Sequence, residues 1–274
     1  MNQRYLHIFW ILLLLMGCEE TIQLDLNQSE PKIVIEGLLT NRLGDQYVKV
    51  TRTVDFYASG GAEKITNAKV KVIDDLGEEH SYAQTSPGYY LPLVDFVGTV
   101  GRSYALSVEV DGALYQSEDQ LLRVPGIDSL GYVLNDDPDQ DRIDSGHLYD
   151  LLLYMKEPKE TTDYYLFKFY RNDSLTFTNP NDIYLLDDEA LSESISGFPG
   201  PVYYAEKDTA RMDMFSVTRN GYVYYSDLTN LLFNDGGLFG PVPANPRSNI
   251  SNGALGFFQV SAVISTQVIL TKKN

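Results

Sequence analysis

Short runs in which apolar and polar residues alternate, separated by turn residues, constrain the fold of this chain most strongly. Val48 and Val50 flank Lys49, and Val70 and Val72 flank Lys71 in the same way. Successive side chains of a strand point to opposite faces, so each run is typical of a strand with one buried face. The alternation returns further along the chain, at Tyr104, Leu106, Val108 and Val110. The pattern predicts a mainly β protein.

A change of composition divides the chain into two predicted β-rich parts. Residues 31–124 are predicted to form an immunoglobulin-like β-sandwich, without the Cys and Trp core residues of antibody domains. Pro125 and the acidic stretch 136–144 mark the joint, and residues 125–274 form the predicted β-rich C-terminal domain. In that domain Tyr165, Phe167 and Phe169 alternate with residues that are themselves partly apolar, which predicts a central strand.

One short helix is predicted in the C-terminal domain. Ser226 can cap its first turn, and Gly236 can end it. Between them Leu228, Leu231 and Leu232 share a face. Residues 238–252 are rich in Gly, Pro and Asn and are predicted to form a long loop, whereas residues 254–270 are apolar enough for one or two final core strands.

The first residues have the features of a secretory signal. Arg4 precedes an apolar run over residues 8–16, which is too short for the roughly 20 residues of a spanning helix. Leu15 to Cys18 resembles the bacterial lipobox, in which the cysteine becomes the first mature residue and is acylated. Residues 1–17 are therefore predicted to be a lipoprotein signal peptide and residues 18–30 a tether. The alternative is a buried free thiol after an ordinary signal.

The charge and the cysteine count exclude several classes of function. The chain has 21 Lys and Arg against 38 Asp and Glu, a net charge of -17, which argues against nucleic acid as a partner. An anionic membrane surface also repels such a chain. Cys18 is the single cysteine, so an intrachain disulfide and a thiolate metal cage are excluded. Contact with a membrane is expected through the acyl chains of Cys18.

The sequence holds few residues that suggest catalysis. Only His80 and His147 follow the signal, and they lie in different predicted domains, so a histidine zinc site is not expected. A Gly-x-Ser-x-Gly elbow, a phosphate loop and a dinucleotide fingerprint are all missing from the sequence. We expect a protein that is not an enzyme and needs no cofactor.

Three aspartates form a weak candidate for a calcium site. Asp137, Asp139 and Asp141 alternate as the first ligands of a calcium loop do. However, Arg142 replaces the turn glycine, and Leu148 stands where a bidentate glutamate closes such a loop. A solvated acidic linker is the preferred interpretation.

Twenty tyrosines are the most unusual feature of the composition. Aromatic faces suit both sugar rings and protein partners, but strand tyrosines are common, and adjacent residues of a strand face opposite ways. Each adjacent pair in a strand is therefore expected to give one core ring and one outer ring. Gly- and Pro-rich segments are better candidates for a partner-binding edge, because they are expected to expose Phe198, Leu238 and Phe239.

Three short motifs are similar to the O-glycosylation acceptors of one bacterial phylum, the Bacteroidota. They begin at Asp128, Asp173 and Asp208, and each continues with Ser or Thr. Chance matches are expected in so acidic a chain, and buried strand starts are the alternative.

Several weak motifs occur together in a more specific order. They are Glu19-Glu20 after Cys18, Ile33 to Gly37, Ala68 to Val70, Gly88 to Tyr90, Ile127 to Leu130, Asn249 to Gly253 and Leu255 to Phe258. Over essentially the whole mature chain this order resembles the domain-of-unknown-function 4249 lipoproteins of Bacteroidota. The resemblance implies an outer-membrane lipoprotein, on the cell surface rather than facing the periplasm, that accompanies a TonB-dependent receptor. The alternative function is a carbohydrate-binding or carbohydrate-cleaving surface lipoprotein.

Overall fold

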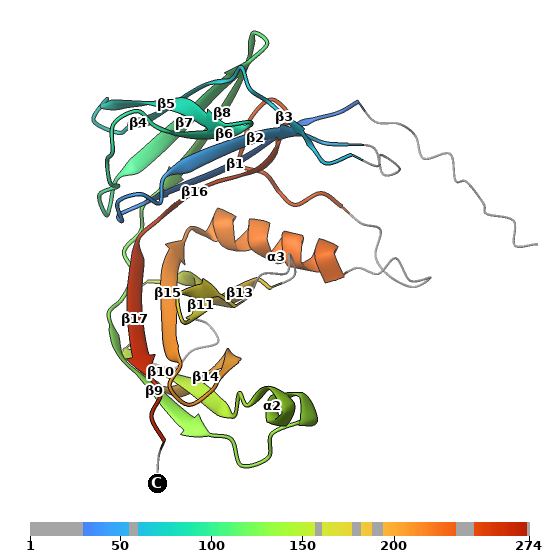
Figure 1. Cartoon of the computed structure of the whole chain (residues 1–274). Helices are drawn as coiled ribbons and strands as arrows, with labels where there is room; N and C mark the ends of the chain where they lie inside the picture. Colours follow the sequence, from blue (N-terminus) through green and yellow to red (C-terminus); the bar gives the residue numbers. More distant parts are fainter. Residues whose placement is uncertain are drawn as a thin grey trace, which may run out of the picture. The chain divides into compact units, whose positions relative to one another are not determined.

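Strands dominate the computed structural model, which describes residues 30–54, 60–156, 161–176, 182–187, 194–233 and 244–272 (Figure 1). The predicted mainly β class is confirmed, with several sheets in a sandwich- or barrel-like arrangement. The chain from Pro31 to Asn274 forms one compact unit, within which the buried residues divide into separate cores.

The first sheet has nine strands. Their order is β16, β1, β2, β6, β5, β4, β7 and β8, and β3 pairs with β2 outside this path. The strands are β1 (Ile33–Thr40), β2 (Tyr47–Arg52), β3 (Glu63–Lys64), β4 (Lys69–Asp74), β5 (Glu79–Ser86), β6 (Tyr89–Pro92), β7 (Ser103–Val110), β8 (Ala113–Gln120) and β16 (Leu255–Ser261).

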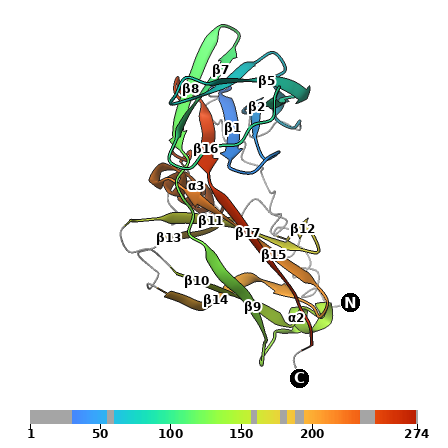
Figure 2. The same ribbon diagram turned by 90° about the vertical axis from the view of Figure 1, so that its left-hand side faces the viewer.

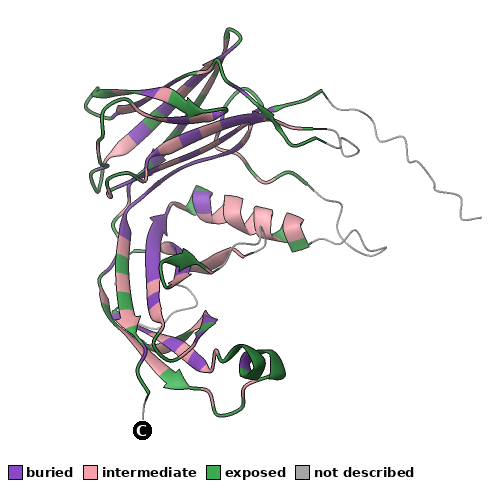
Figure 3. Cartoon of the chain, viewed as in Figure 1, coloured by how far each residue is buried: buried purple, intermediate pink, exposed green. Residues whose placement is uncertain are grey.

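The alternating runs supply the core of this sheet, as predicted. Val48 and Val50 of β2 and Val70 and Val72 of β4 are buried, while the residues between them are half-buried (Figure 3). The run in β7 is buried in the same way, at Tyr104, Leu106, Val108 and Val110.

Strand β16 comes from the far end of the chain and pairs in parallel with β1. Its Phe258 and Val260 lie in the first core. The two backbones lie so close that a Cβ on Gly256 would stand 2.1 Å from the Ile35 carbonyl oxygen, and Gly256 has a φ of 99°. The predicted boundary at residue 124 is therefore corrected: residues 31–124 do not hold the complete first core, because β16 completes it.

The loop before β16 links that strand to β8, the strand at the opposite end of the strand order. The Asn249 side chain donates to the Phe258 carbonyl and accepts from the Phe258 amide, both at 2.9 Å. Ser251 pairs with the Gln116 backbone through its amide and its hydroxyl, both at 2.8 Å. The loop thus forms hydrogen bonds with backbone groups of both strands that no neighbouring strand pairs.

Two smaller sheets enclose a second core. One has the order β14, β10, β9, and the other has the order β12, β11, β15, β17 with β13 paired to β11. The strands are β9 (Ile127–Leu134), β10 (Tyr149–Lys156), β11 (Tyr164–Arg171), β12 (Ser174–Leu175), β13 (Tyr184–Asp187), β14 (Ser194–Tyr204), β15 (Thr209–Val217) and β17 (Val263–Ile269). Strand β16 continues into β17 with only Ala262 between them (Figure 2).

Strand β11 is buried on both faces, as its apolar alternation predicts. Tyr165, Phe167 and Phe169 lie in the second core, and Leu166 lies in a third, smaller core. The third core also contains Phe215 of β15 and is covered by residues of the C-terminal helix.

The helix prediction is corrected in two respects: the helix begins earlier than predicted, and the described residues contain a second helix. Helix α3 (Arg219–Phe233) begins seven residues before Ser226, and the Thr218 hydroxyl accepts from the Gly221 amide at its first turn. Ser226 lies inside the helix and donates to the Tyr222 carbonyl. The predicted end at Gly236 lies outside the described residues. A second short helix, α2 (Gln140–Ser145), occupies the acidic stretch that was predicted to be a linker.

Candidate functional site

Six exposed apolar side chains lie on the loops that follow β1, β4 and β6, at one end of the first sheet. Leu76, on the β4–β5 turn, is 81% exposed, and Val94, between β6 and β7, is 77% exposed. We call this set the apolar rim; its members are Leu43, Leu76, Leu93, Val94, Val97 and Val100. Large apolar side chains that gather in this way on loops are typical of interaction surfaces.

Backbone hydrogen bonds and aromatic packing hold the segment that carries most of the rim. The Gly98 amide donates to the Thr40 carbonyl at 2.8 Å, and the Thr99 amide donates to the Tyr104 hydroxyl at 2.8 Å. The Phe96 ring turns inward and stacks on His80, with 3.6 Å between the ring centroids. The exposed residues on either side of Phe96 therefore lie on an ordered loop.

Arg102 joins this segment to the turn that carries Leu76. Its Nη2 atom lies 2.7 Å from Asp74 Oδ2, and its Nε donates to Asp75 Oδ1 at 2.6 Å. The hydrogen bond from Arg102 lowers the pKa of the exposed Asp75 carboxyl. One guanidinium group thus links the β6–β7 segment of the rim to the turn that carries Leu76.

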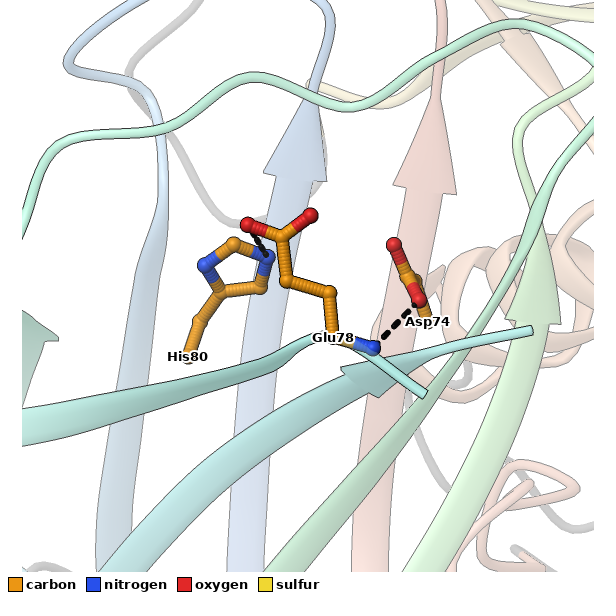
Figure 4. Close-up of side chains that lie close together, drawn as sticks. All are labelled: Asp74, Glu78 and His80. Carbon is orange, nitrogen blue, oxygen red and sulfur yellow. Dashed lines mark hydrogen bonds and ion pairs between the residues drawn. The ribbon is translucent and has the colours of Figure 1, made fainter. Parts of the chain in front are cut away.

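Asp74, Glu78 and His80 lie close together where β4 turns into β5 (Figure 4). One potential ligand atom from each residue lies within 4.8 Å of the other two. Among the described residues this is the one group of possible metal ligands with such spacing. The Asp74 carboxylate already accepts the amides of Leu76 and Glu78 and faces Arg102. An arginine beside a carboxylate opposes a bound cation, so the geometry fits a stabilised turn better than a metal centre.

A broad groove of about 950 Å³ lies over β4, β7 and β8. Its polar lining includes Lys69, Lys71, Ser107, Glu109, Gln116 and Glu118. Lys69 pairs with Glu109, and Lys71 pairs with Glu79, both at 2.8 Å. The groove is thus a sheet surface with a mixed polar and apolar lining, and its lysines are already paired.

Tyrosines gather on the outer side of β2 and β6, opposite the first core. Tyr47 and Tyr89 stack with 5.3 Å between ring centroids and 15° between ring planes. Tyr224 of α3 stacks on Phe257 of β16 at 5.0 Å. Burial raises the pKa of both Tyr47 and Tyr224 to about 12, and the negative charge of Glu36 adds to both shifts.

The comparison with known families bears on the whole chain. Residues 19–267 match the model of the family described as Domain of unknown function (DUF4249). The chain belongs to this family. No curated protein matches it.

Three of the sequence-predicted site residues of this DUF4249 protein lie outside the described residues: Cys18, Leu238 and Phe239. The structure describes Phe198 and corrects the reason for choosing it. The residue lies in β14, is only half-buried, and its ring packs against the second core. It does not stand on an exposed irregular loop.

The aspartates of the candidate calcium site have other roles in the DUF4249 chain. Asp139 caps α2 by accepting the Arg142 amide at 2.9 Å. The Asp137 backbone amide donates to the Asn135 side chain. Asp137, Asp139 and Asp141 are all exposed and do not form a ligand group of the kind found at Asp74.

The prediction of one core ring and one outer ring is confirmed for the tyrosine pairs of β6 and β14 but not for that of β11, where Tyr165 lies in the second core and Tyr164 packs against the third. Tyr90, Tyr165 and Tyr204 are buried, while their neighbours Tyr89 and Tyr164 are half-buried and Tyr203 is exposed. The fourth pair, Tyr224 and Tyr225, lies in α3, where both rings are half-buried.

Two of the three glycosylation-like motifs have exposed hydroxyl residues. Ser129 lies in β9 and Ser174 in β12, and both are exposed, whereas Thr209 at the start of β15 is half-buried. Burial therefore does not protect the two serines, and their modification stays a prediction that intact-mass measurement on native protein tests.

The sequence analysis missed the apolar rim. The signal is the run Leu93-Val94-Asp95-Phe96-Val97, which is apolar at four of five positions and lacks the alternation of a strand. Among the described residues, neither helix is long and apolar enough to cross a membrane.

Proposed function

We propose that this DUF4249 protein is a non-enzymatic outer-membrane lipoprotein of Bacteroidota, displayed on the cell surface through acylated Cys18. It acts by binding, as an accessory component beside a TonB-dependent transporter. The apolar rim is the contact surface. The observation that supports this assignment is the gathering of large exposed aliphatic side chains on loops that internal hydrogen bonds already order.

A protein partner fits the rim better than a lipid surface. Asp75, Glu78 and Asp95 are exposed next to the apolar side chains, and the whole chain carries a net charge of -17. Anionic headgroups repel such a surface, whereas a protein with an apolar centre and a basic margin complements it. Because the loops are ordered before binding, little conformational entropy is lost when a partner docks.

Rim substitutions test the proposed contact surface. Val94→Asp combined with Leu76→Asp places charge at the centre of the rim without disturbing a core residue. We expect purification from native membranes to recover a β-barrel receptor with the parent protein and to lose it with this variant. The control is Ile269→Asp on β17, where the replaced side chain is 61% exposed. Equal recovery of the receptor with the rim variant would reject the rim as the contact surface.

The anchor is tested separately at Cys18. Cys18→Ser removes the sulfur that carries the acyl chain, so we expect the unprocessed precursor to accumulate and the mature protein to leave the outer-membrane fraction. Fractionation followed by intact-mass measurement checks both effects. Normal processing and unchanged fractionation of the variant would contradict the lipid anchor while leaving the rim experiment open.

A carbohydrate-binding surface lipoprotein is the second candidate function. The stacked tyrosines on the outer side of the first sheet favour it, because flat aromatic rings suit the apolar face of a sugar. In the described residues no comparable observation favours carbohydrate cleavage.

A further inference from the structure

Three neighbouring strands place charged and aromatic side chains in one row on the outer side of the first sheet. In the register, Glu36 of β1 lies opposite Lys49 of β2, and Lys49 lies opposite Tyr89 of β6. Tyr47 is two residues from Lys49 and therefore lies on the same face. We call these four residues, together with Tyr224, the tyrosine face.

The two tyrosines stack on each other beside an ion pair. Tyr47 and Tyr89 are nearly parallel, and Lys49 Nζ lies 2.8 Å from Glu36 Oε1. The Lys49 and Glu36 side chains are 36% and 43% exposed, so a ligand can reach them. The pair keeps one donor and one acceptor group close to the aromatic rings.

Helix α3 limits the tyrosine face on the β16 side. Phe257 of β16 lies opposite Glu36 in the register, and Tyr224 of α3 stacks on Phe257. Glu36 shifts the pKa of both Tyr47 and Tyr224 upward, which places its charge near both phenols. Both phenols therefore stay protonated at neutral pH and can donate hydrogen bonds.

The backbone groups of these strands are already paired, so a ligand on this face can be recognised only by side chains. Strands β1, β2 and β6 pair with one another along this row, so a ligand on the face of the sheet does not add as a further strand. A peptide that binds by strand addition is thus disfavoured. A pyranose ring matches the arrangement, because one of its faces is apolar and its edge carries hydroxyl groups.

We propose that the tyrosine face is a saccharide-binding site, on which a pyranose of a glycan stacks on the outer side of the Tyr47–Tyr89 pair and its hydroxyl groups bond to Lys49 and Glu36. The site is separate from the apolar rim. The proposal rests on the second candidate function, carbohydrate binding, and names the residues that form its site.

Calorimetry with defined oligosaccharides tests the site. The probes are cellotetraose, maltotetraose, mannotetraose, xylotetraose and N-acetylchitotetraose, added to the full mature protein in a detergent without a sugar headgroup. We expect at least one probe to bind. Tyr47→Ala and Tyr89→Ala then weaken that binding by about tenfold or more, since each removes a stacking ring. Lys49→Met weakens binding as well, because it keeps the length of the side chain and removes its donor.

Two control variants separate recognition from folding. Tyr47→Phe keeps the ring and is expected to bind within about threefold of the parent, because only a hydroxyl is lost. Tyr203→Ala removes an exposed tyrosine of β14 and leaves binding unchanged. Binding of no probe, or equal binding by the parent and the Tyr47→Ala and Tyr89→Ala variants with native circular dichroism, overturns the proposal. Neither result affects recovery of a receptor through the rim, so the two proposals fail separately.

Discussion

Asp119 is a carboxyl group that folding removes from water. It lies in β8, is 8% exposed, and accepts the Thr218 hydroxyl at 2.8 Å and the Val260 amide at 2.9 Å. Burial raises its pKa to about 6, although these hydrogen bonds favour the charged form. It therefore links β8, β16 and the residue before α3 through one ionisable group.

The raised pKa makes the stability of the protein depend on pH at this residue. Because the folded pKa lies above the unfolded value, the stabilising contribution is complete below the unfolded pKa and is lost as the pH rises through about 6. We expect the unfolding free energy of the parent to fall by about 1–2 kcal/mol relative to Asp119→Asn between pH 5 and pH 7.5.

Urea titrations over this pH interval measure the difference and stay above the isoelectric point near 4.4. Asp128→Asn, which changes an exposed acid on β9, is the control and should follow the parent. A constant difference between the parent and Asp119→Asn would show that the carboxyl does not titrate in this range. Tyr225, whose pKa responds to Asp119, is left intact in each variant.

At the scale of elements, the loop before β16 replaces a missing strand. Asn249 satisfies the amide and the carbonyl of Phe258, which point away from β1. Asn249→Ala leaves both groups of a fully buried residue without a partner, so we expect a loss of about 2–4 kcal/mol in the free energy of unfolding. Chemical denaturation measures this loss.

The control for the loop is the same substitution at an exposed asparagine. Asn67 donates to Asp111 on the surface, and Asn67→Ala should cost less than about 0.5 kcal/mol. If the free energy of unfolding falls equally in both variants, the hydrogen bonds from Asn249 to Phe258 do not stabilise the contact between the loop and β16.

The local patterns that depend on neighbouring residues could be predicted from the sequence. Val48, Val50 and the buried residues of β7 follow directly from the alternation. The prediction that Phe198 lies on an exposed loop was wrong. Pro199 and Pro201 indicate a loop, but β14 is an edge strand, where a proline does not interrupt hydrogen bonds on both sides of the strand. The start of α3 was not predicted because its first turns depend on tertiary contacts, such as those of Gly221 and Tyr224 with Phe257 of β16.

The candidate site could be predicted only in part, because its members meet through long-range pairing. The tyrosine pairs were recognised as half outer and half core, but the row from Glu36 to Tyr89 depends on the order β1, β2, β6, which skips three strands of the sequence. The parallel pairing of β1 with β16 joins residues from opposite ends of the chain. Alternation along a strand contains no information on its partner.

On the scale of the whole molecule, a cluster of charged residues joins the first sheet to the sheet that contains β15 and β17. Arg42, after β1, donates to Asp213 of β15 at 3.1 Å and to Ser265 of β17 at 2.9 Å. Asp213 is fully buried and also accepts Arg211 at 3.0 Å. This contact adds to the continuous run from β16 to β17 and to the hydrogen bond between Asp119 and Thr218 in joining the two cores.

Loss of Arg42 is expected to weaken this connection. Arg42→Ala leaves the buried Asp213 carboxylate with less compensation, which should lower the free energy of unfolding by about 1–3 kcal/mol, less than for a fully buried pair because Arg42 is partly exposed. The matched control is Arg247→Ala, which breaks an exposed pair with Asp227 and should cost at most about 1 kcal/mol.

The shape of the urea unfolding transition shows whether Arg42 couples the two cores or makes only a local contact. If Arg42 couples the cores, Arg42→Ala broadens the urea transition or divides it into two, because the core around β1 and the core around β11 then unfold with less mutual dependence. Arg247→Ala keeps a single transition with the slope of the parent. An equal loss of stability in both variants, with one unchanged transition, would mean that Arg42 does not couple the two cores.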